Sequence, residues 1–234
     1  MENKYILSEQ MSLYGEQDIV GFGNEDFYIK EIKREVSNKI IVKNHYSKKT
    51  YNATYIHLGL YVEEKLLGVL QYGYAMNPAS MSSVVEGTSI DEYLELNRMW
   101  LSDKITSLYP ESRAISFSVK YLKRKFPKIK WIQSFADERC GGFGIVYQAC
   151  SFNYYGEHLS KFWEFEGETF HNSIMTSEKA GPRGFKILNN PLNKDKVIKH
   201  ELRQFRYIKF INQKWKKKCL LKEMPYPKHY LQNK

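Results

Sequence analysis

Apolar residues recur along the chain with two periods, one typical of helices and one typical of strands. In residues 26–49 they recur at helical spacing, at Ile29, Ile32, Val36, Ile40 and Ile41. This pattern predicts a helix that ends near Asn44. Residues 54–76 contain two β-rich runs around the charged turn Glu63-Glu64-Lys65, which indicates a hairpin.

The middle of the chain predicts a strand, a helix, a strand and a helix in succession. Residues 91–103 alternate polar and apolar positions, and residues 112–126 form an amphipathic helix with Ser112 as its N-cap. Residues 129–137 are apolar enough for a central strand, and residues 145–152 favour a short helix. Two neighbouring strands joined by a helix are expected to be parallel, with a ligand beyond their carboxyl ends. The fold class is therefore α/β (α+β), a mixed central sheet flanked by helices.

The net charge of +10 is concentrated at one end of the chain. Residues 1–178 contain 20 Lys and Arg against 23 Asp and Glu, whereas residues 179–234 contain 16 against 3. We predict a main domain in residues 1–178, of which residues 1–25 stay unassigned. A basic C-terminal extension, residues 179–234, is expected to pack on that domain and to contact a polyanion. The alternative is a solvated tail that only aids solubility.

Cysteine content and hydropathy exclude several classes. Cys140, Cys150 and Cys219 are odd in number and lack a Cys-x-x-Cys pair, which argues against a disulfide framework or structural zinc. We interpret Cys140 and Cys150 as packing residues. The N-terminus has no signal-peptide pattern, and no apolar run approaches the roughly 20 residues that span a bilayer. We expect a cytoplasmic protein without a membrane partner, and the oligomeric state, including a homodimer, stays open.

Asp137 is the first candidate for chemistry, because it ends an apolar strand just before the glycine turn Gly141-Gly142. It fits a general base or a metal ligand, and equally a residue that caps the turn. The pair His45-Tyr46 follows the first helix. These two side chains fit a reaction site. The alternative is that His45 bonds to a last carbonyl of the helix and Tyr46 caps the core.

Arg98 lies within an alternating strand beside apolar positions, so a half-buried guanidinium there needs an anionic partner. That partner is a ligand phosphate or carboxylate, or an acid such as Glu95. Asn97 is expected to face the side opposite Arg98. Ser112 can cap its helix and contact an anion at the same time. Tyr147 is a candidate acid or a buried tyrosine with a bonded hydroxyl.

Several stretches together resemble the Mom family of phage DNA-modification proteins. They are "NHYSK" (44–48), "LGLYVEEKLLGVLQYG" (58–73), "ELNRMWLSD" (95–103), "ESRAISFSVKYLKRKFPKIKWIQSFAD" (111–137), "GIVYQACSF" (144–152) and "PYPK" (225–228). The order of elements is also similar to that of GNAT acyltransferases. The resemblance implies a GNAT-like fold and a transferase that converts the exocyclic amine of adenine in double-stranded DNA to an acetamido (carbamoylmethyl) form. Such a product shields phage DNA from restriction, which places the protein in the cytoplasm of a bacterial host.

The resemblance also implies roles for the candidate residues. Asp137, His45 and Tyr46 are expected to serve as catalytic or iron-binding residues, and Tyr147 as the acid near the leaving group. Acetyl-CoA or another activated two-carbon donor is implied, with Arg98, Asn97, Ser112 and Arg113 as donor contacts. The chain departs from GNAT enzymes at "SLYPESRAIS", because this turn lacks the glycines that cradle a pyrophosphate.

The basic tail is expected to hold DNA. The proposed phosphate contacts are Arg203, Arg206, Lys209, Lys214, Lys216, Lys217 and Lys218. The aromatic residues between them are available to pack on the core or to stack on a base. Two other functions remain open: a GNAT-type acyltransferase for a protein or small-molecule amine, and a non-catalytic DNA-binding protein on the same scaffold.

Overall fold

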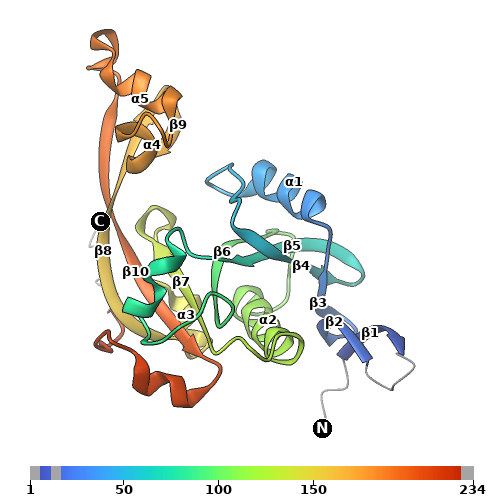
Figure 1. The fold of residues 1–234 in the computed structure, drawn as a ribbon. Helices are drawn as coiled ribbons and strands as arrows, with labels where there is room; N and C mark the ends of the chain where they lie inside the picture. The colour runs from blue at the N-terminus through green and yellow to red at the C-terminus, as the bar shows by residue number, and fades with distance from the viewer. Residues whose placement is uncertain (1–5, 12–16, 228–234) are drawn as a thin grey trace. The chain divides into compact units, whose positions relative to one another are not determined.

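The computed structural model describes residues 6–11 and 17–227 (Figure 1). The strands are β1 (Ile6–Met11), β2 (Gln17–Asn24), β3 (Phe27–Glu31), β4 (Thr54–Val62), β5 (Lys65–Gly73), β6 (Tyr93–Leu101), β7 (Trp131–Asp137), β8 (Asn153–Phe165), β9 (Glu168–His171) and β10 (Ile198–Phe210). The α-helices are α1 (Arg34–Asn44), α2 (Pro110–Lys125), α3 (Ile145–Ala149), α4 (Asn172–Thr176) and α5 (Pro182–Asn189). Short 3₁₀ helices are η1 (Pro78–Ser83), η2 (Glu138–Cys140), η3 (Pro191–Asn193) and η4 (Gln213–Lys218).

The strands form one mixed sheet in the order β1-β2-β3-β4-β5-β6-β7-β10-β8-β9. Neighbours from β1 to β6 are antiparallel, whereas β6 and β7 are parallel. The predicted α/β class, the hairpin at Glu63-Glu64 and the parallel pair joined by a helix are confirmed. Glu63 and Glu64 both have positive φ, which is the conformation that a two-residue hairpin turn requires.

The chain divides into two compact units. Unit 1 contains the described residues up to Ser134, together with Ile145–Tyr155 and Tyr207–Tyr226. Unit 2 contains Phe135–Gly144, Gly156–Arg206 and the described end of the chain at Pro227. Strands β7, β8 and β10 run from one unit into the other. Within the described residues, none of the helices is long and apolar enough to cross a membrane.

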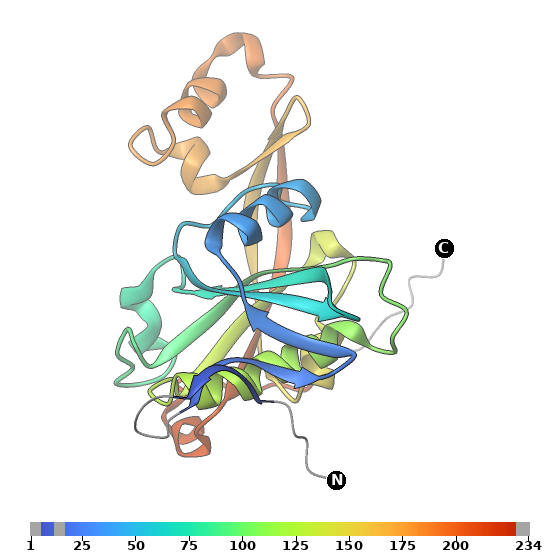
Figure 2. The ribbon, with the colours of Figure 1, turned by 90° about the vertical axis from the view of Figure 1, so that its right-hand side faces the viewer.

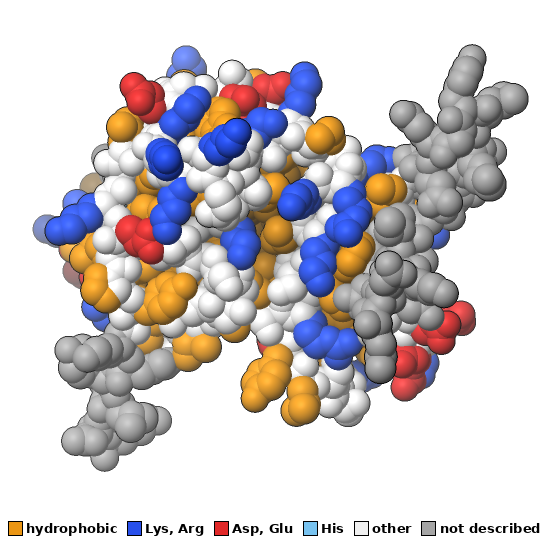
Figure 3. All heavy atoms as spheres, turned by 90° about the horizontal axis from the view of Figure 1, so that it is seen from below, with side chains coloured by type: hydrophobic (Ala, Val, Ile, Leu, Met, Phe, Trp, Pro, Cys, Tyr) orange, Lys and Arg blue, Asp and Glu red, His pale blue; other side chains and the backbone are white. Residues whose placement is uncertain are grey.

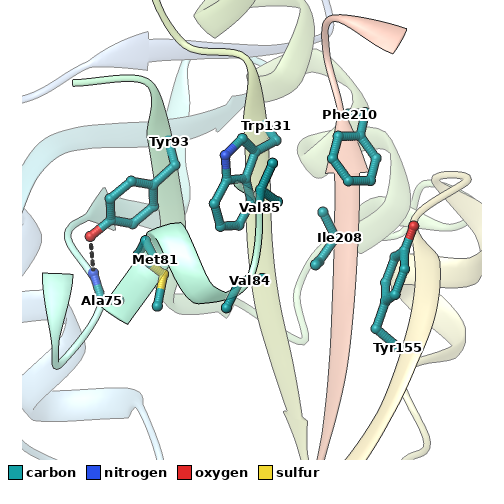
Figure 4. Packing of buried hydrophobic residues seen from close by; sticks show 9 residues of the cluster. All are labelled: Ala75, Met81, Val84, Val85, Tyr93, Trp131, Tyr155, Ile208 and Phe210. Carbon is teal, nitrogen blue, oxygen red and sulfur yellow. Dashed lines mark hydrogen bonds between the residues drawn. The ribbon is translucent and has the colours of Figure 1, made fainter. Parts of the chain in front are cut away.

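In unit 1, α1 and α2 cover opposite faces of the sheet, as Figures 1 and 2 show. Gln71 of β5 fixes α1, since its amide donates to Ser37 Oγ at 2.8 Å and Asn38 Oδ1 at 3.0 Å. Trp131, fully buried, packs against Tyr93 with ring centroids 5.3 Å apart. The cluster around these rings comprises Ala75, Met81, Val84, Val85, Tyr93, Trp131, Tyr155, Ile208 and Phe210 (Figure 4). It joins segments far apart in sequence and so holds the start of β6 and β7 in place.

In unit 2, β8 and β9 form an antiparallel hairpin, and α4 and α5 pack against each other beyond it (Figure 1). Gly181 and Gly184 permit this contact. A Cβ added at Gly181 would lie 2.3 Å from the Ile174 side chain, and one at Gly184 would lie 2.8 Å from the Ile174 carbonyl oxygen. The glycines of "AGPRG" are therefore required for helix packing.

Two predicted boundaries were wrong. The first helix begins at Arg34, because residues 27–31 pair with β2 and β4 as strand β3. Ile29 fits the apolar period of a strand as well as that of a helix. It is in a strand because its backbone pairs with β2 and β4. The N-cap of α2 is Tyr109 in a left-handed conformation, followed by Pro110 at the first helical position. Ser112 Oγ instead donates to Tyr109 O at 3.1 Å, from inside the first turn.

The basic C-terminal segment does not follow the sheet but contributes to it. Its strand β10 lies between β7 and β8, and residues 179–206 and 207–226 belong to different units. Phe205, Tyr207 and Phe210 are buried, so these aromatic side chains pack on the core and cannot stack on a base. Residues 228–234 of the predicted extension lie outside the described residues.

Candidate active site

The ladder between the parallel strands β6 and β7 is short. Tyr93, Leu94 and Glu95 pair with Trp131, Ile132 and Gln133, and the pairing stops there. Beyond Glu95 the β6 strand carries a bulge, because Gln71 pairs with Arg98 and Tyr72 pairs with Leu96, which leaves Asn97 without a partner on β5. Ligands bind where parallel strands part, and bulges re-aim side chains beside such sites.

Glu95 is held at this point by two carboxamides. Gln133 Nε2 donates to Glu95 Oε2 at 2.7 Å, and Asn97 Nδ2 donates to Glu95 Oε1 at 3.0 Å. Gln133 is only 1% exposed. The amide oxygens of Gln133 and Asn97 are buried and accept no hydrogen bond from any described residue. Buried acceptors without a donor are costly, by about 1–3 kcal/mol each, so this cluster is prepared to receive N–H groups.

Arg98 follows directly on the strand. Its Nη1 donates to Asn97 O at 2.7 Å, and its guanidinium lies 5.6 Å from the Tyr51 ring centroid. Its Nε is buried without an acceptor, and among the described residues no carboxylate forms an ion pair with Arg98. Burial, and then the Glu95 charge, raise the pKa of Tyr51 to about 12, so its phenol stays protonated at neutral pH. The internal salt bridge that the sequence allowed for Arg98 is not formed in this part of the chain.

Tyr147 of α3 is fixed by a buried hydrogen bond. Its hydroxyl lies 2.9 Å from Ser134 Oγ, which in turn lies 3.2 Å from the carbonyl oxygen of Leu96. The Tyr147 ring packs against the rings of Phe152 and Tyr207, with centroid distances of 5.7 Å and 5.4 Å respectively. A single chain of hydrogen bonds therefore links the phenol of α3 to β7 and to the bulged part of β6.

The N-terminus of α2 does not form the cradle of a pyrophosphate site. Arg113 stacks on the Phe27 ring at 4.1 Å, Ser112 Oγ donates from the first turn to the carbonyl oxygen of Tyr109, and the acid of the first turn is Glu111. Tyr109 occupies the left-handed position that a glycine would favour. These contacts fit a helix cap better than a phosphate contact. Ser112 and Arg113 thus remain predicted donor contacts without a supporting geometry.

Asp137 ends β7 in unit 2 and is 7% exposed. Its Oδ1 accepts from the backbone N–H of Arg139 at 3.0 Å and so caps η2. The Arg139 guanidinium binds both carboxylate oxygens, and it also stacks on the Phe162 ring at 4.0 Å. The structure therefore supports the capping interpretation and adds a rigid ion pair, which fixes the direction of the carboxylate.

His45 and Tyr46 follow α1 in unit 1. His45 is 6% exposed and Tyr46 is 50% exposed, with ring centroids 4.2 Å apart. The His45 Nδ1 accepts the backbone N–H of Ser47 at 3.1 Å and contacts Ser47 Oγ at 2.8 Å. Because Nδ1 accepts a hydrogen bond, the neutral imidazole carries its hydrogen on Nε2.

These hydrogen bonds do not fit the predicted iron site. The His45 imidazole carries a hydrogen on Nε2 and accepts a hydrogen bond at Nδ1, so neither ring nitrogen has a lone pair available for a metal. The Asp137 carboxylate is bound by the positively charged guanidinium of Arg139. Among the described residues, no group of three His, Cys, Asp or Glu side chains is arranged to hold a metal ion. Asp137 and His45 also lie in different units, so their predicted grouping with Tyr46 and Tyr147 stays a prediction.

Most of the predicted DNA contacts are already engaged within the protein. Arg203 pairs with Glu138 at 2.8 Å, Arg206 lies over the Phe135 ring at 5.1 Å, and Lys209 donates to the Cys150 carbonyl at 2.9 Å. Burial also lowers the pKa of Lys209. In η4, Lys216 pairs with Glu223 and Lys218 lies over Trp215, whereas Lys214 and Lys217 are exposed.

The two predicted packing cysteines differ. Cys150 is buried, and its thiol contacts Ser112 O at 3.2 Å, in agreement with the prediction. Cys140 is exposed in η2, so its predicted packing role was wrong.

Sequence reasoning missed Gln133 and Tyr51 and treated Glu95 only as a partner of Arg98. A signal was available for Gln133, since it is the one amide inside the apolar strand 129–137. A buried carboxamide in a central strand needs a partner, and that requirement points to a polar site. Tyr51 carries no such signal, because it lies in a loop that only the fold brings to Arg98.

Comparison with known proteins places this chain in a family. Residues 26–228 match the Mom protein family. The chain is 41% identical over 227 residues to a methylcarbamoylase Mom of Escherichia phage Mu, covering 95% of this chain and 92% of that protein. Solved structures with similar coordinates include a ribosomal-protein-S5-alanine acetyltransferase of Vibrio fischeri, with TM-score 0.48 and 11% identity over 84% of this chain and 98% of that one. Another is the RimL ribosomal L7/L12 α-N-protein acetyltransferase, with TM-score 0.46 and 10% identity, covering 81% of this chain and 96% of that one.

Proposed function

Because the chain belongs to the Mom protein family, we propose that it is a transferase that modifies the exocyclic amine of adenine in double-stranded DNA to an acetamido form. The observation that carries this proposal is the polar cluster at the end of the β6–β7 ladder. There, two buried amide oxygens accept no hydrogen bond from the described residues and lie beside the Glu95 carboxylate, and the adjacent Arg98 guanidinium forms no ion pair within the same part of the chain. The Tyr147 phenol is fixed separately, through Ser134 of β7. This set matches a substrate that brings N–H donors and a donor molecule that brings negative charge.

The adenine amine is a poor nucleophile, since its lone pair is delocalised into the ring. In the proposed reaction the amine nitrogen bonds to the methylene carbon of an acetamido donor, and the bond from that carbon to the leaving group breaks. One amine proton passes to a base, for which Asp137 is the predicted residue, and the leaving group takes a proton from Tyr147. Because the Arg139 guanidinium binds both oxygens of the Asp137 carboxylate, this step requires Arg139 to release it. Arg98 is the proposed contact for the anionic part of the donor, which is supported by its buried Nε without an acceptor among the described residues.

The balance of atoms restricts the donor. An acetyl thioester has no amide nitrogen and no leaving group on its methyl carbon, so acetyl-CoA alone does not yield a carbamoylmethyl group. The donor must supply both the amide nitrogen and a leaving group on the methylene carbon, as an activated two-carbon amide does. If acetyl-CoA supplies the two carbons, a nitrogen source and an oxidant must also take part. The proposal routes no step through iron, because the hydrogen bonds of His45 and Asp137 do not fit metal ligands.

The biological setting follows from the product. Restriction enzymes read the adenine amine as a donor in the major groove, so a substituted amine blocks that contact. We propose that the protein acts in the bacterial cytoplasm on phage or prophage DNA.

The test is mass spectrometry of nucleosides from DNA of cells that express the protein. Wild type is expected to yield a deoxyadenosine heavier by one carbamoylmethyl substituent. Tyr147→Phe removes the phenol but keeps the ring packing, and is expected to lower the yield by about 100-fold, the range of a lost general acid. Tyr61→Phe is the matched control, since Tyr61 stacks on Tyr28 away from the cluster and should leave the yield unchanged.

The outcomes separate the remaining functions. DNA without any modified deoxyadenosine contradicts the proposal and leaves a DNA-binding protein or an acyltransferase for another amine. A Tyr147→Phe protein with full activity removes the acid role but leaves the transferase. Feeding cells with isotope-labelled amino acids or acetate then identifies the source of the two carbons and the nitrogen.

A further inference from the structure

The segment from α5 to η3 in unit 2 carries an apolar side chain that the fold leaves in solvent. Leu192 of η3 is 83% exposed. A single exposed leucine is ordinary on a protein surface, but this one sits on a turn whose backbone is fixed on both sides. Burying this side chain against a partner would be favourable, so it is available for a contact outside the chain.

Asparagine side chains fix the turn. Asn190 Oδ1 accepts the backbone N–H of Leu192 at 3.0 Å, and Asn193 Nδ2 donates to Ile187 O at 3.1 Å. The backbone N–H of Asn193 also bonds Asn190 O at 2.9 Å. Because the backbone is already ordered, little conformational entropy is lost when Leu192 enters a partner.

Lysine and arginine residues flank this leucine in the sequence, with Asp195 as the acidic residue between Lys194 and Lys196. Lys179, Lys186, Lys194 and Lys196 are exposed, and none of them forms an ion pair with a residue in the described ranges. Arg183 pairs with Glu168 at 2.8 Å. The segment also forms an open hollow of about 420 Å³, lined by Pro182, Arg183, Lys186, Ile187, Asn190 and Asn193. Lysine, arginine and asparagine side chains are the donors that bind phosphate oxygens along a nucleic acid backbone.

We infer that the α5–η3 segment opens the DNA duplex, with Leu192 inserted between base pairs and Lys186, Lys194 and Lys196 on the flanking phosphates. The inference rests on the proposed function, because a reaction at the amine of a paired adenine requires the base to leave the stack. Proteins that unstack a base step commonly fill the gap with an apolar side chain, which offsets part of the unstacking cost.

The first experiment follows unstacking without requiring the reaction. Duplexes that carry 2-aminopurine in place of adenine become more fluorescent when that base leaves the stack. Wild type is expected to raise the fluorescence at saturation, and Leu192→Ala to abolish most of the rise. Leu159→Ala is the matched control, because Leu159 is 62% exposed on strand β8 of the same unit. An equal rise for Leu192→Ala and wild type overturns the inference.

The second experiment uses the modified nucleoside as readout. Leu192→Ala is expected to reduce modification of paired adenine at least 10-fold, and to recover on duplexes in which the adenine is mispaired, since a mispaired base is cheaper to unstack. An equal reduction on both substrates means that Leu192 does not act on stacking. If wild type modifies no adenine, the proposed function fails, while the fluorescence experiment still decides the role of Leu192.

A third measurement tests the lysines. Replacing Lys186, Lys194 and Lys196 by glutamine is expected to reduce the slope of log Kd against log salt concentration by about 0.9 for each lost phosphate contact. The control replaces the exposed lysines Lys39, Lys104 and Lys123 of unit 1 and should leave the slope unchanged. Identical slopes for the two triple variants contradict the placement of phosphates on this segment.

Discussion

At the residue scale, Arg98 shows how a sequence pattern and its structure complement each other. The alternation of residues 91–103 predicts that a guanidinium lies beside apolar side chains and needs an anion. The structure adds that Nε is buried without an acceptor and that, among described residues, no ion pair satisfies it. Asp137 is the contrasting case, because Arg139 binds its carboxylate and the sequence "DER" gives no indication of that geometry.

His57 of β4 gives a prediction on pH. It is 6% exposed, and neither ring nitrogen has a hydrogen-bond partner within the described chain. Burial, and then the charge of Arg34, lower the pKa of His57 below its ordinary value of 6.5. The unfolded chain therefore binds more protons than the folded one as the pH falls below about 6.5, and stability decreases until the pH passes the folded pKa.

Replacing His57 by leucine removes this proton uptake. The free energy of unfolding of wild type, measured by urea denaturation at pH 7, 6 and 5, is expected to fall more steeply with acidification than that of His57→Leu. Burial also lowers the pKa values of His158 and His171, so part of the slope remains in the variant. Parallel curves for the two proteins would show that His57 is not a source of acid sensitivity.

At the scale of elements, the periods of apolar residues predict most segments but not their ends. The helix within residues 26–44 and the strand β3 share Ile29, and only pairing with β2 and β4 separates them. The bulge at Asn97 is likewise invisible in the sequence, since it depends on the register between β5 and β6. Both features matter, because α1 ends at Asn44, directly before His45, and the bulge places Asn97 beside Glu95.

The start of α2 gives a prediction on stability. Tyr109 has a left-handed conformation with φ of 52°, and its side chain is 77% exposed. A side chain in this region costs about 1–2 kcal/mol, whereas glycine adopts it freely at an entropic cost of about 0.5–1 kcal/mol. Tyr109→Gly is therefore expected to raise the free energy of unfolding by roughly 0.5–1 kcal/mol.

The neighbouring position supplies the control for this prediction. Leu108 is equally exposed but has no left-handed conformation, so Leu108→Gly is expected to destabilise the protein. Chemical denaturation of both variants checks the difference. A loss of stability in Tyr109→Gly as large as that in Leu108→Gly would show that the tyrosine is not strained.

At the scale of the whole molecule, charge is the property that the sequence describes best. The surplus of Lys and Arg after residue 178 is visible in composition alone, and Figure 3 shows many Lys and Arg side chains, with fewer Asp and Glu, on one face. The structure changes how this charge is used. Arg203, Arg206 and Lys209 lie on a strand of the sheet and contact the protein itself.

DNA binding tests which cations remain available in η4. Lys214 and Lys217 are exposed, whereas Lys216 pairs with Glu223. Replacing Lys214 and Lys217 by glutamine is expected to lower the slope of log Kd against log salt by up to about 1.8, corresponding to two phosphate contacts. Replacing Lys209 should leave that slope unchanged. Fluorescence anisotropy with a labelled duplex at 50–200 mM salt measures both, and equal slopes for wild type and the double variant would exclude η4 from the DNA contact.

The sequence by itself determined the α/β class, the hairpin, the parallel pair around α2 and the candidates Asp137, Arg98 and Tyr147, because these depend on local periodicity and residue type. Only the tertiary structure decided that Gln133 and Asn97 hold Glu95, that Ser134 holds Tyr147, and that the basic tail forms a central strand. Most of those contacts join residues distant in sequence, and they are set by the register of the strands and by the burial of the side chains. A local sequence pattern encodes neither strand register nor burial in the folded chain.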